Sequence, residues 1–136
     1  MENSKAFTDD KKYTYDDFLG IIAKLRAPGG CPWDQKQTHE SLKDCLLEES
    51  NEVLAAIDNR DDENLCEELG DVLLQVVMHA QIAAEEGRFT MKDVVQCVAE
   101  KMVRRHPHVF GDIKVNSVEE GLDLWNAIKA QEKARK

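Results

Sequence analysis

The sequence predicts an all-α protein, a helical bundle of about five helices with a central antiparallel helix pair. Apolar residues recur at intervals of three and four in several segments, which is the spacing of one face of an α-helix. No segment shows the alternation of apolar and polar residues that is typical of a β-strand. A chain of 136 residues with 42% apolar content can form one core. We therefore expect a single domain over residues 14–136, preceded by a flexible lead-in at residues 1–13.

The first helix is expected over Tyr15–Arg26, because its apolar residues follow the helical spacing and Thr14 is a suitable N-cap. The segment Ala27–Asp34 contains two prolines and two glycines and cannot continue that helix, so it predicts a shaped loop. Trp33 in this loop has two interpretations, a plug in the core or a contact with a ligand. Lys36 is a second candidate contact from the same loop.

The central pair is expected over His39–Asn59 and Asp62–Glu86, with Thr38 as the N-cap of the first helix. The polar turn between them is short, so the two helices should pack antiparallel. The second helix becomes apolar nearly all round from Val72 to Ile82, and a helix that is apolar on every side is buried on every side. In a small domain this is easiest against a second copy, so the sequence predicts a homodimer or a higher homo-oligomer.

Two further helices are expected, one that follows Thr90 and one that opens at Ser117 with a capping box and runs to about Ala134. On the first of them Lys101 and Arg105 fall on or at the edge of the apolar face, one turn apart. These inward cations are candidates for holding phosphate oxygens. The neighbouring Arg104 points away from that face and is assigned to the helix dipole alone.

Two clusters of carboxylates lie on the central helix pair. Glu49 and Glu52 are one helical turn apart on the first helix, and Glu68 and Asp71 repeat this spacing on the second. Glu49 also falls within the apolar arc of its helix, which consists of Leu42, Leu46, Val53 and Ile57.

Four ionised carboxylates on facing inner surfaces repel one another unless a cation lies between them. Ligands that are all oxygen favour a hard ion, Mg²⁺ or Mn²⁺, over Zn²⁺. The alternative interpretation is that these acids lie on solvated helix faces, as they do in most glutamate-rich helices.

Composition excludes several classes of function. A net charge of −9 argues against non-specific binding to nucleic acid or to a membrane surface. The start of the chain has no apolar signal region, and no apolar run is long enough to span a bilayer. The cysteines are widely spaced, without a Cys-x-x-Cys pair, and fit free thiols in a cytoplasmic protein. They are Cys31, Cys45, Cys66 and Cys97.

The acidic pattern Glu-Glu-x-x-Glu, which begins at Glu48, is followed by Glu-x-x-Asp at Glu68. Together they resemble the metal-binding signature of the all-α nucleotide pyrophosphohydrolases. Two further stretches, Gly-Gly-Cys-Pro-Trp-Asp-Gln-Lys-Gln-Thr at 29–38 and Arg-Arg-His-Pro-His-Val-Phe-Gly-Asp at 104–112, look like the MazG branch of that superfamily. The resemblance covers about residues 15–133.

This resemblance implies Mg²⁺-dependent hydrolysis of a nucleoside triphosphate to the monophosphate and pyrophosphate. The matching metal ligands are Glu49, Glu52, Glu68 and Asp71. The positions that match nucleotide contacts in the family are Lys101, Arg105, Trp125 and Lys129.

Other roles follow from the chemistry of the residues. Glu48 or Glu49 is the candidate general base for the attacking water. Trp125 and Lys129 share a helix face, and Trp125 has two interpretations, packing alone or a cover for a base.

Two other functions are compatible with acidic clusters on a helical bundle. A catalytically silent, acidic helical module that senses nucleotides or binds partners would keep the same fold. A di-iron carboxylate bundle would require Glu-x-x-His on its helices, and this motif is absent from the sequence. For the enzyme, two biological purposes are open: nucleotide pool sanitation, which clears aberrant nucleotides, and adjustment of a normal pool.

Overall fold

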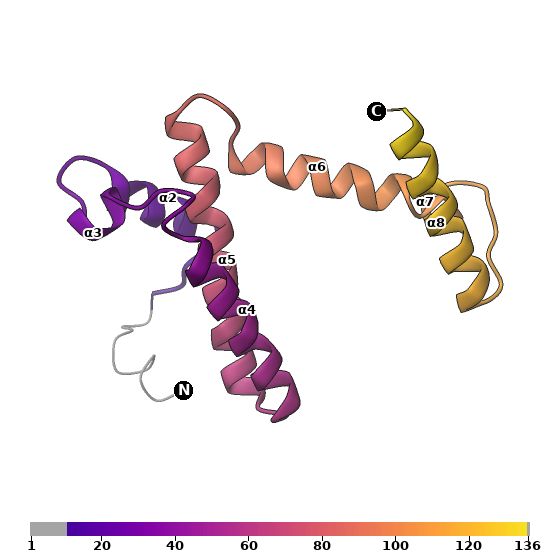
Figure 1. Cartoon of the computed structure of the whole chain (residues 1–136), viewed down its shortest axis with the longest axis horizontal. Coiled ribbons are helices and arrows are strands. Elements are labelled where there is room, and N and C mark those ends of the chain that lie inside the picture. Colours follow the sequence, from indigo (N-terminus) through magenta and orange to yellow (C-terminus); the bar gives the residue numbers. More distant parts are fainter. Residues whose placement is uncertain (1–10, 136) are drawn as a thin grey trace. The chain divides into compact units, whose positions relative to one another are not determined.

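The computed structural model describes residues 11–135, and the regular elements in that range are all helical (Figure 1), which confirms the all-α prediction. The expected lead-in at residues 1–13 lies outside the described residues except for its last three. In the described part of the chain, no helix combines the length and the apolar character needed to cross a membrane. The helices are α2 (Tyr15–Arg26), α3 (Pro32–Gln35), α4 (Lys43–Asp58), α5 (Asp62–Glu85), α6 (Met91–Arg104), α7 (Pro107–Phe110) and α8 (Val118–Ala134).

The five long helices correspond to the five expected ones. The one-turn helices α3 and α7 were not predicted, because a single turn that opens with proline carries no apolar periodicity. The chain divides into two compact units, one that ends at Met91 and one that begins at Lys92. The single domain expected over residues 14–136 stays a prediction.

In the first unit, α4 and α5 form the expected antiparallel pair (Figure 1), joined by a tight turn in which Arg60 has a positive φ of 52°. Asp61 caps α5 by accepting a hydrogen bond from the Asn64 N–H at 3.2 Å. Helix α2 packs against the C-terminal half of α5. The core cluster lies there and consists of Ile22, Leu42, Val77, Met78 and Ile82.

The predicted start of the first central helix was wrong. Helix α4 begins at Lys43, with Leu42 as an N-cap that makes no side-chain bond. The Thr38 N–H donates to Ser41 Oγ at 2.8 Å, and the Ser41 N–H donates back to Thr38 Oγ1 at 3.1 Å. These reciprocal bonds close a separate turn before α4, so the hydroxyl group of Thr38 is used in that turn.

The large apolar side chains of the central pair are fully buried only in the C-terminal half of α5. The buried residues of α5 lie between Gln75 and Ala83, in the half that packs against α2. The prediction that Val72–Ile82 is buried on every side is therefore confirmed only in part. On α4 and on the first half of α5, six large apolar side chains are between 37% and 63% exposed: Leu46, Leu47, Leu54, Ile57, Leu69 and Leu73.

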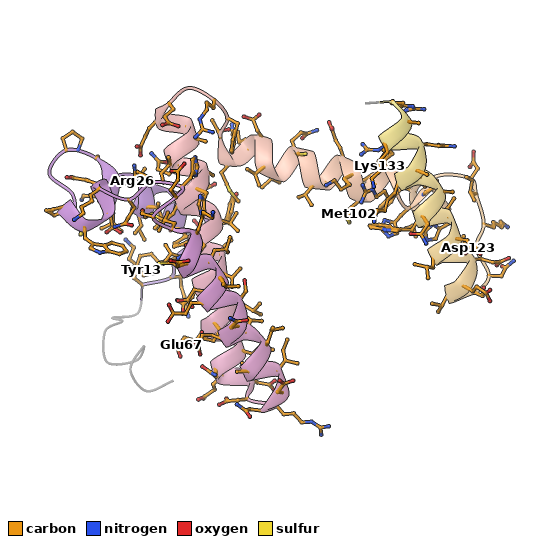
Figure 2. All side chains as sticks on the ribbon, in the orientation of Figure 1. Tyr13, Arg26, Glu67, Met102, Asp123 and Lys133 are labelled. Atoms are coloured by element: carbon orange, nitrogen blue, oxygen red, sulfur yellow. The ribbon has the colours of Figure 1, made fainter. Side chains whose placement is uncertain are left out.

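Arg26 at the end of α2 holds the loop that follows it, and Figure 2 labels its position. Its guanidinium donates to both carboxylate oxygens of Glu85 on α5, at 2.8 and 3.0 Å. It also donates to the carbonyl oxygens of Asp34 and Gln37, at 2.6 and 3.0 Å. Trp33 on this loop is 57% exposed, so its interpretation as a plug in the core of this chain was wrong.

In the second unit, α6, α7 and α8 contain no fully buried residue. Ser117 caps α8 as predicted, because its hydroxyl accepts a hydrogen bond from the Glu120 N–H at 3.1 Å. The carboxylate of Glu120 reaches the N–H of Asn116 rather than that of Ser117, so the capping box is shifted by one residue. Charged residues at the ends of α6 and α8 form two ion pairs, Arg104 and Arg105 each with Glu132.

Candidate metal centre and basic cluster

Three carboxylates converge where α4 and α5 face each other. Each of Glu49, Glu68 and Asp71 offers an oxygen, and these oxygens all lie within 4.8 Å of one another. The antiparallel pairing of the helices places Glu49 opposite the pair on α5, whose members are one turn apart. All three residues are half-buried, unlike the acids of a fully solvated helix face.

The carboxylates of this cluster disfavour one another's charge. Burial raises the pKa of Glu49, and the charges of Asp71, Glu68, Glu48 and Glu52 raise it further. Burial likewise raises the pKa of Glu68, with further contributions from Asp71, Glu52 and Glu67. A cation held between the three oxygens would remove this repulsion.

The donor set fits a small hard ion. Mg²⁺ takes oxygen ligands at about 2.0–2.1 Å in an octahedral arrangement, so its ligand oxygens are roughly 3–4 Å apart. Three carboxylate oxygens within 4.8 Å of one another can adopt that spacing with small side-chain adjustments. The cluster contains neither histidine nor cysteine, which fits Mg²⁺ or Mn²⁺ better than Zn²⁺.

The structure brings together three of the four predicted metal ligands. Glu52 is exposed and lies outside the group of converging oxygens, although its charge still acts on Glu49 and Glu68. Glu48, one of the two candidate bases, is also exposed and acts on Glu49. A helical projection places Glu52 beside Glu49 but gives no information on the distance to α5.

The second unit holds a basic cluster around one carboxylate. Arg105, whose side chain is 15% exposed, donates from Nε and Nη2 to Glu132 Oε1, at 3.2 and 2.7 Å. Arg104 donates from Nε to Glu132 Oε2 at 2.6 Å. The assignment of Arg104 to the helix dipole alone was therefore wrong, because Glu132 on α8 lies within its reach.

Trp125 packs against one cationic and one aromatic side chain. The Arg105 guanidinium carbon is 5.0 Å from the centre of its ring, and the His106 ring centre is 5.3 Å away. The structure thus places Trp125 in side-chain packing, and its contact with a base stays a prediction. Of the other predicted phosphate contacts, Lys101 is half-buried on α6 and Lys129 is exposed on α8.

Sequence reasoning missed Glu132, which accepts hydrogen bonds from both arginines. Its only sequence signal is its place on α8, seven residues after Trp125 and three after Lys129, which puts it on the face that they share. Nothing in the sequence indicated that the same face meets the end of α6.

A histidine pair in the first unit was also missed. His39 and His79 lie with their Nδ1 atoms 2.7 Å apart and their rings within 2° of parallel. Arg88 contacts His39 Nε2 at 2.5 Å, and because arginine can only donate, His39 must donate from Nδ1 to His79. Burial, and then the neighbouring His39, lower the pKa of His79. Lys36 lines a cavity of about 530 Å³ near this pair, together with Arg26, His39, Glu85 and Arg88.

The chain is similar to the family described as the MazG nucleotide pyrophosphohydrolase domain, which matches residues 37–110. It is 55% identical over 122 residues to a protein of Thermotoga maritima named nucleoside triphosphate pyrophosphohydrolase/pyrophosphatase MazG, covering 90% of this chain and 46% of that protein. It is 47% identical over 122 residues to the nucleoside triphosphate pyrophosphohydrolase of Escherichia coli K12, covering 89% of this chain and 46% of that protein. The chain thus spans about half the length of these curated relatives.

A solved structure shows the same fold. The crystal structure of a MazG-related protein from Thermotoga maritima has a TM-score of 0.69 and 34% sequence identity, and the match covers 85% of this chain and 98% of that one. The family match includes Glu49, Glu68 and Asp71, the three residues whose oxygens converge. The chain belongs to the MazG nucleotide pyrophosphohydrolase domain family.

Proposed function

We propose that this chain hydrolyses nucleoside triphosphates, with ribose or deoxyribose and including non-standard bases, to a nucleoside monophosphate and pyrophosphate in the presence of Mg²⁺ or Mn²⁺. The observation that carries the proposal is the convergence of Glu49, Glu68 and Asp71 in a member of this family. The names of the relatives from Thermotoga maritima and Escherichia coli support the reaction class.

Each group of residues has a role in this proposal. Glu49, Glu68 and Asp71, with Glu52 beside them, would hold Mg²⁺, which would neutralise triphosphate charge and activate the attacking water. Glu49 or Glu48 would accept the proton of that water, because both are carboxylates at this cluster.

The basic residues act on the leaving group. Lys101 and Arg105 stabilise the charge that develops on the departing pyrophosphate. Lys129 contributes a further contact to phosphate, and Trp125 covers the base. Trp33 and Lys36 are proposed contacts from the loop around α3, where Trp33 is exposed and Lys36 lines a cavity.

The test is pyrophosphate release from a panel of ribo-, deoxyribo- and damaged nucleoside triphosphates, with and without Mg²⁺. Asp71→Asn and Glu68→Gln should each reduce turnover by at least about 100-fold. Substitution of a residue that only hydrogen-bonds to a metal ligand already lowers metal affinity or activity by about 10–100-fold, and these two residues are proposed ligands themselves. Their melting temperature without metal should stay the same or rise, because each change removes a repelling charge.

Glu67→Gln is the matched control, because Glu67 is an exposed carboxylate next to Glu68 on the same helix (Figure 2) and belongs to no proposed site. It should retain activity. Wild-type turnover of Asp71→Asn at saturating Mg²⁺ would show that the metal assignment is wrong. Binding of nucleotides without any release of pyrophosphate would instead identify a silent nucleotide-sensing module.

The location and the biological purpose of the reaction can also be proposed. Nucleoside triphosphates and free thiols are both found in the cytoplasm, and the cysteines of the described residues are free, so we propose a cytoplasmic location. A preference for damaged bases in the substrate panel would indicate pool sanitation, and a preference for one standard nucleotide would indicate pool adjustment.

A further inference from the structure

We propose that Glu132 is a positioning residue, which holds the Arg105 guanidinium against Trp125 and leaves its outer N–H groups directed to phosphate. This inference rests on the proposed function, because it concerns how the basic cluster binds the pyrophosphate part of a nucleotide. It assigns to a carboxylate on α8 a role in binding an anion.

The pattern of hydrogen bonds shows which donors Glu132 uses. Its Oε1 accepts from Nε and Nη2 of Arg105, and its Oε2 accepts from Nε of Arg104 and, at 3.5 Å, from Nε of Arg105. An arginine has five N–H groups, so this arrangement leaves three of them on Arg105. Among the described residues no hydrogen bond involves Nη1 of Arg105. The edge of the guanidinium formed by Nη1 and the second Nη2 hydrogen is therefore available for bidentate contact with phosphate.

The position of the guanidinium is fixed on a second side. Its carbon lies 5.0 Å from the centre of the Trp125 ring, and Trp125 is on the same helix as Glu132. Contacts to an aromatic face and to a carboxylate restrict the rotamers of a long side chain, which lowers the entropy lost on binding. Lys101 is one turn before Arg105 and Lys129 is one turn before Glu132, so both lysines lie on the helix faces that carry the cluster.

The charge balance of the cluster suits an anion. Two guanidinium groups and one carboxylate leave one net positive charge in the cluster, and the negative charge of Glu100 acts on Arg104 from outside it. Hydrogen bonds from Arg105 and Arg104 lower the pKa of Glu132 to about 2, so this carboxylate stays ionised near neutral pH. Without it, two adjacent arginines would repel each other and separate in solution.

Positioning and simple charge repulsion predict opposite results when the carboxylate is neutralised. If Glu132 acts only as a negative charge near an anion site, Glu132→Gln should strengthen phosphate binding. If Glu132 positions Arg105, the same change should weaken binding, because an amide keeps only one acceptor oxygen and loses the charge that holds both arginines.

The first experiment measures kcat and KM for a good nucleoside triphosphate substrate in Glu132→Gln and Glu132→Asp. We expect kcat/KM to fall roughly 10- to 100-fold in Glu132→Gln, since misplacement of a binding group by about 1 Å has effects of this size. The loss should appear in both KM and kcat, because Arg105 contacts phosphate in the bound substrate and stabilises the charge that develops on the leaving group. Glu132→Asp keeps the charge but is one methylene shorter, so it should give an intermediate kcat/KM. Circular dichroism checks the helix content of each variant.

Asp123→Asn is the matched control, because it removes one exposed carboxylate from the same helix (Figure 2). Its kcat/KM should equal that of the unsubstituted chain. A kcat/KM that is unchanged or higher in Glu132→Gln would overturn the proposal.

The second experiment needs no variant of Glu132 and no turnover. The arginine Nε–H signals of the full chain are recorded by ¹H–¹⁵N NMR while pyrophosphate is added, with Arg104→Lys and Arg105→Lys used for assignment. If Glu132 positions Arg105, its Nε–H signal stays protected and shifts as pyrophosphate binds. Loss of that protection would mean that Arg105 leaves Glu132 for phosphate, and would overturn the proposal.

The two experiments separate this inference from the proposed function. If the unsubstituted chain hydrolyses no nucleoside triphosphate, the proposed function fails. The role of Glu132 can still be tested, because calorimetry measures the affinity of Glu132→Gln for pyrophosphate without any turnover. An affinity at least about tenfold weaker than that of the unsubstituted chain supports positioning. A smaller loss, an equal affinity or a stronger one contradicts it.

Discussion

Glu132 accepts hydrogen bonds from Arg105 and Arg104, and these bonds lower its pKa from 4.5 to about 2. A carboxyl group with a lowered pKa stabilises the fold fully above its unfolded pKa, and that contribution is lost as the pH falls through the folded pKa. The relevant window is therefore about pH 4.5 to 2. Burial and like charges shift the pKa of Glu49 and Glu68 upward, so they contribute in the opposite direction.

We predict that the melting temperature of the unsubstituted chain exceeds that of Glu132→Gln near neutral pH, and that this difference shrinks as the pH falls below 4.5. The difference isolates Glu132, because the other carboxyl groups titrate in both proteins. Melting curves followed by circular dichroism, from pH 7 down to the lowest pH at which both proteins are folded, measure it. A difference that stays constant below pH 4.5 would contradict the ion pairs seen in the structure.

At the scale of the element, the loop after α2 depends on Arg26, whose side chain is only 7% exposed. Arg26→Gln should lower the free energy of unfolding by about 2–4 kcal/mol, because it leaves Glu85 and two carbonyl oxygens without their charged donor. Lys24→Gln, an exposed change in the last turn of the same helix, should have little effect. Urea unfolding of both variants makes the comparison, and equal stabilities would show that Arg26 does not hold the loop.

The same loop depends on a close backbone approach at Gly30. A Cβ atom there would lie 2.3 Å from the Leu25 carbonyl oxygen and 2.4 Å from that of Lys24. Gly30→Ala should therefore cost on the order of 1–3 kcal/mol. Gly20→Ala, at an exposed helix position where a Cβ meets nothing within 4 Å, should instead stabilise the protein by about 0.5–1 kcal/mol. Thermal unfolding of the two variants should give shifts of opposite sign, and shifts of the same sign would contradict this account of the loop.

At the scale of the whole molecule, we expect a homo-oligomer. Six large apolar residues of α4 and of the first half of α5 are exposed in the single chain, among them Leu54, which is 58% exposed. Leu47 and Leu54 are seven residues apart on α4, and Leu69 and Leu73 are four apart on α5, so each pair forms a stripe on its helix. A surface of this kind is a common site of association in soluble proteins.

Light scattering at low micromolar concentration tests this expectation. The unsubstituted chain should give at least twice the monomer mass, and Leu54→Arg should shift the mass toward the monomer. Val118→Arg is the control, because Val118 is 91% exposed at the start of α8, outside the α4–α5 pair, and its substitution should leave the mass unchanged. A monomeric mass for the unsubstituted chain would refute the prediction.

The sequence by itself determined the parts of this protein that depend on neighbouring residues. The five long helices follow from apolar spacing, and Thr14 and Ser117 cap their helices because each side chain reaches an N–H three residues later. The pair of Glu68 and Asp71 follows from the same helical spacing. Family motifs in the sequence identified the MazG fold, which the match to a solved structure confirms.

Only the tertiary structure decided which side chains meet. The oxygens of Glu49, Glu68 and Asp71 converge while Glu52 remains outside, a difference that depends on how α4 packs on α5. Arg104 and Arg105 both reach Glu132, which is 28 and 27 residues further along the chain. Helical periodicity fixes the direction of a side chain about its own helix axis. The distance between two helices depends on packing across the fold, and residue spacing within one helix carries no information about it.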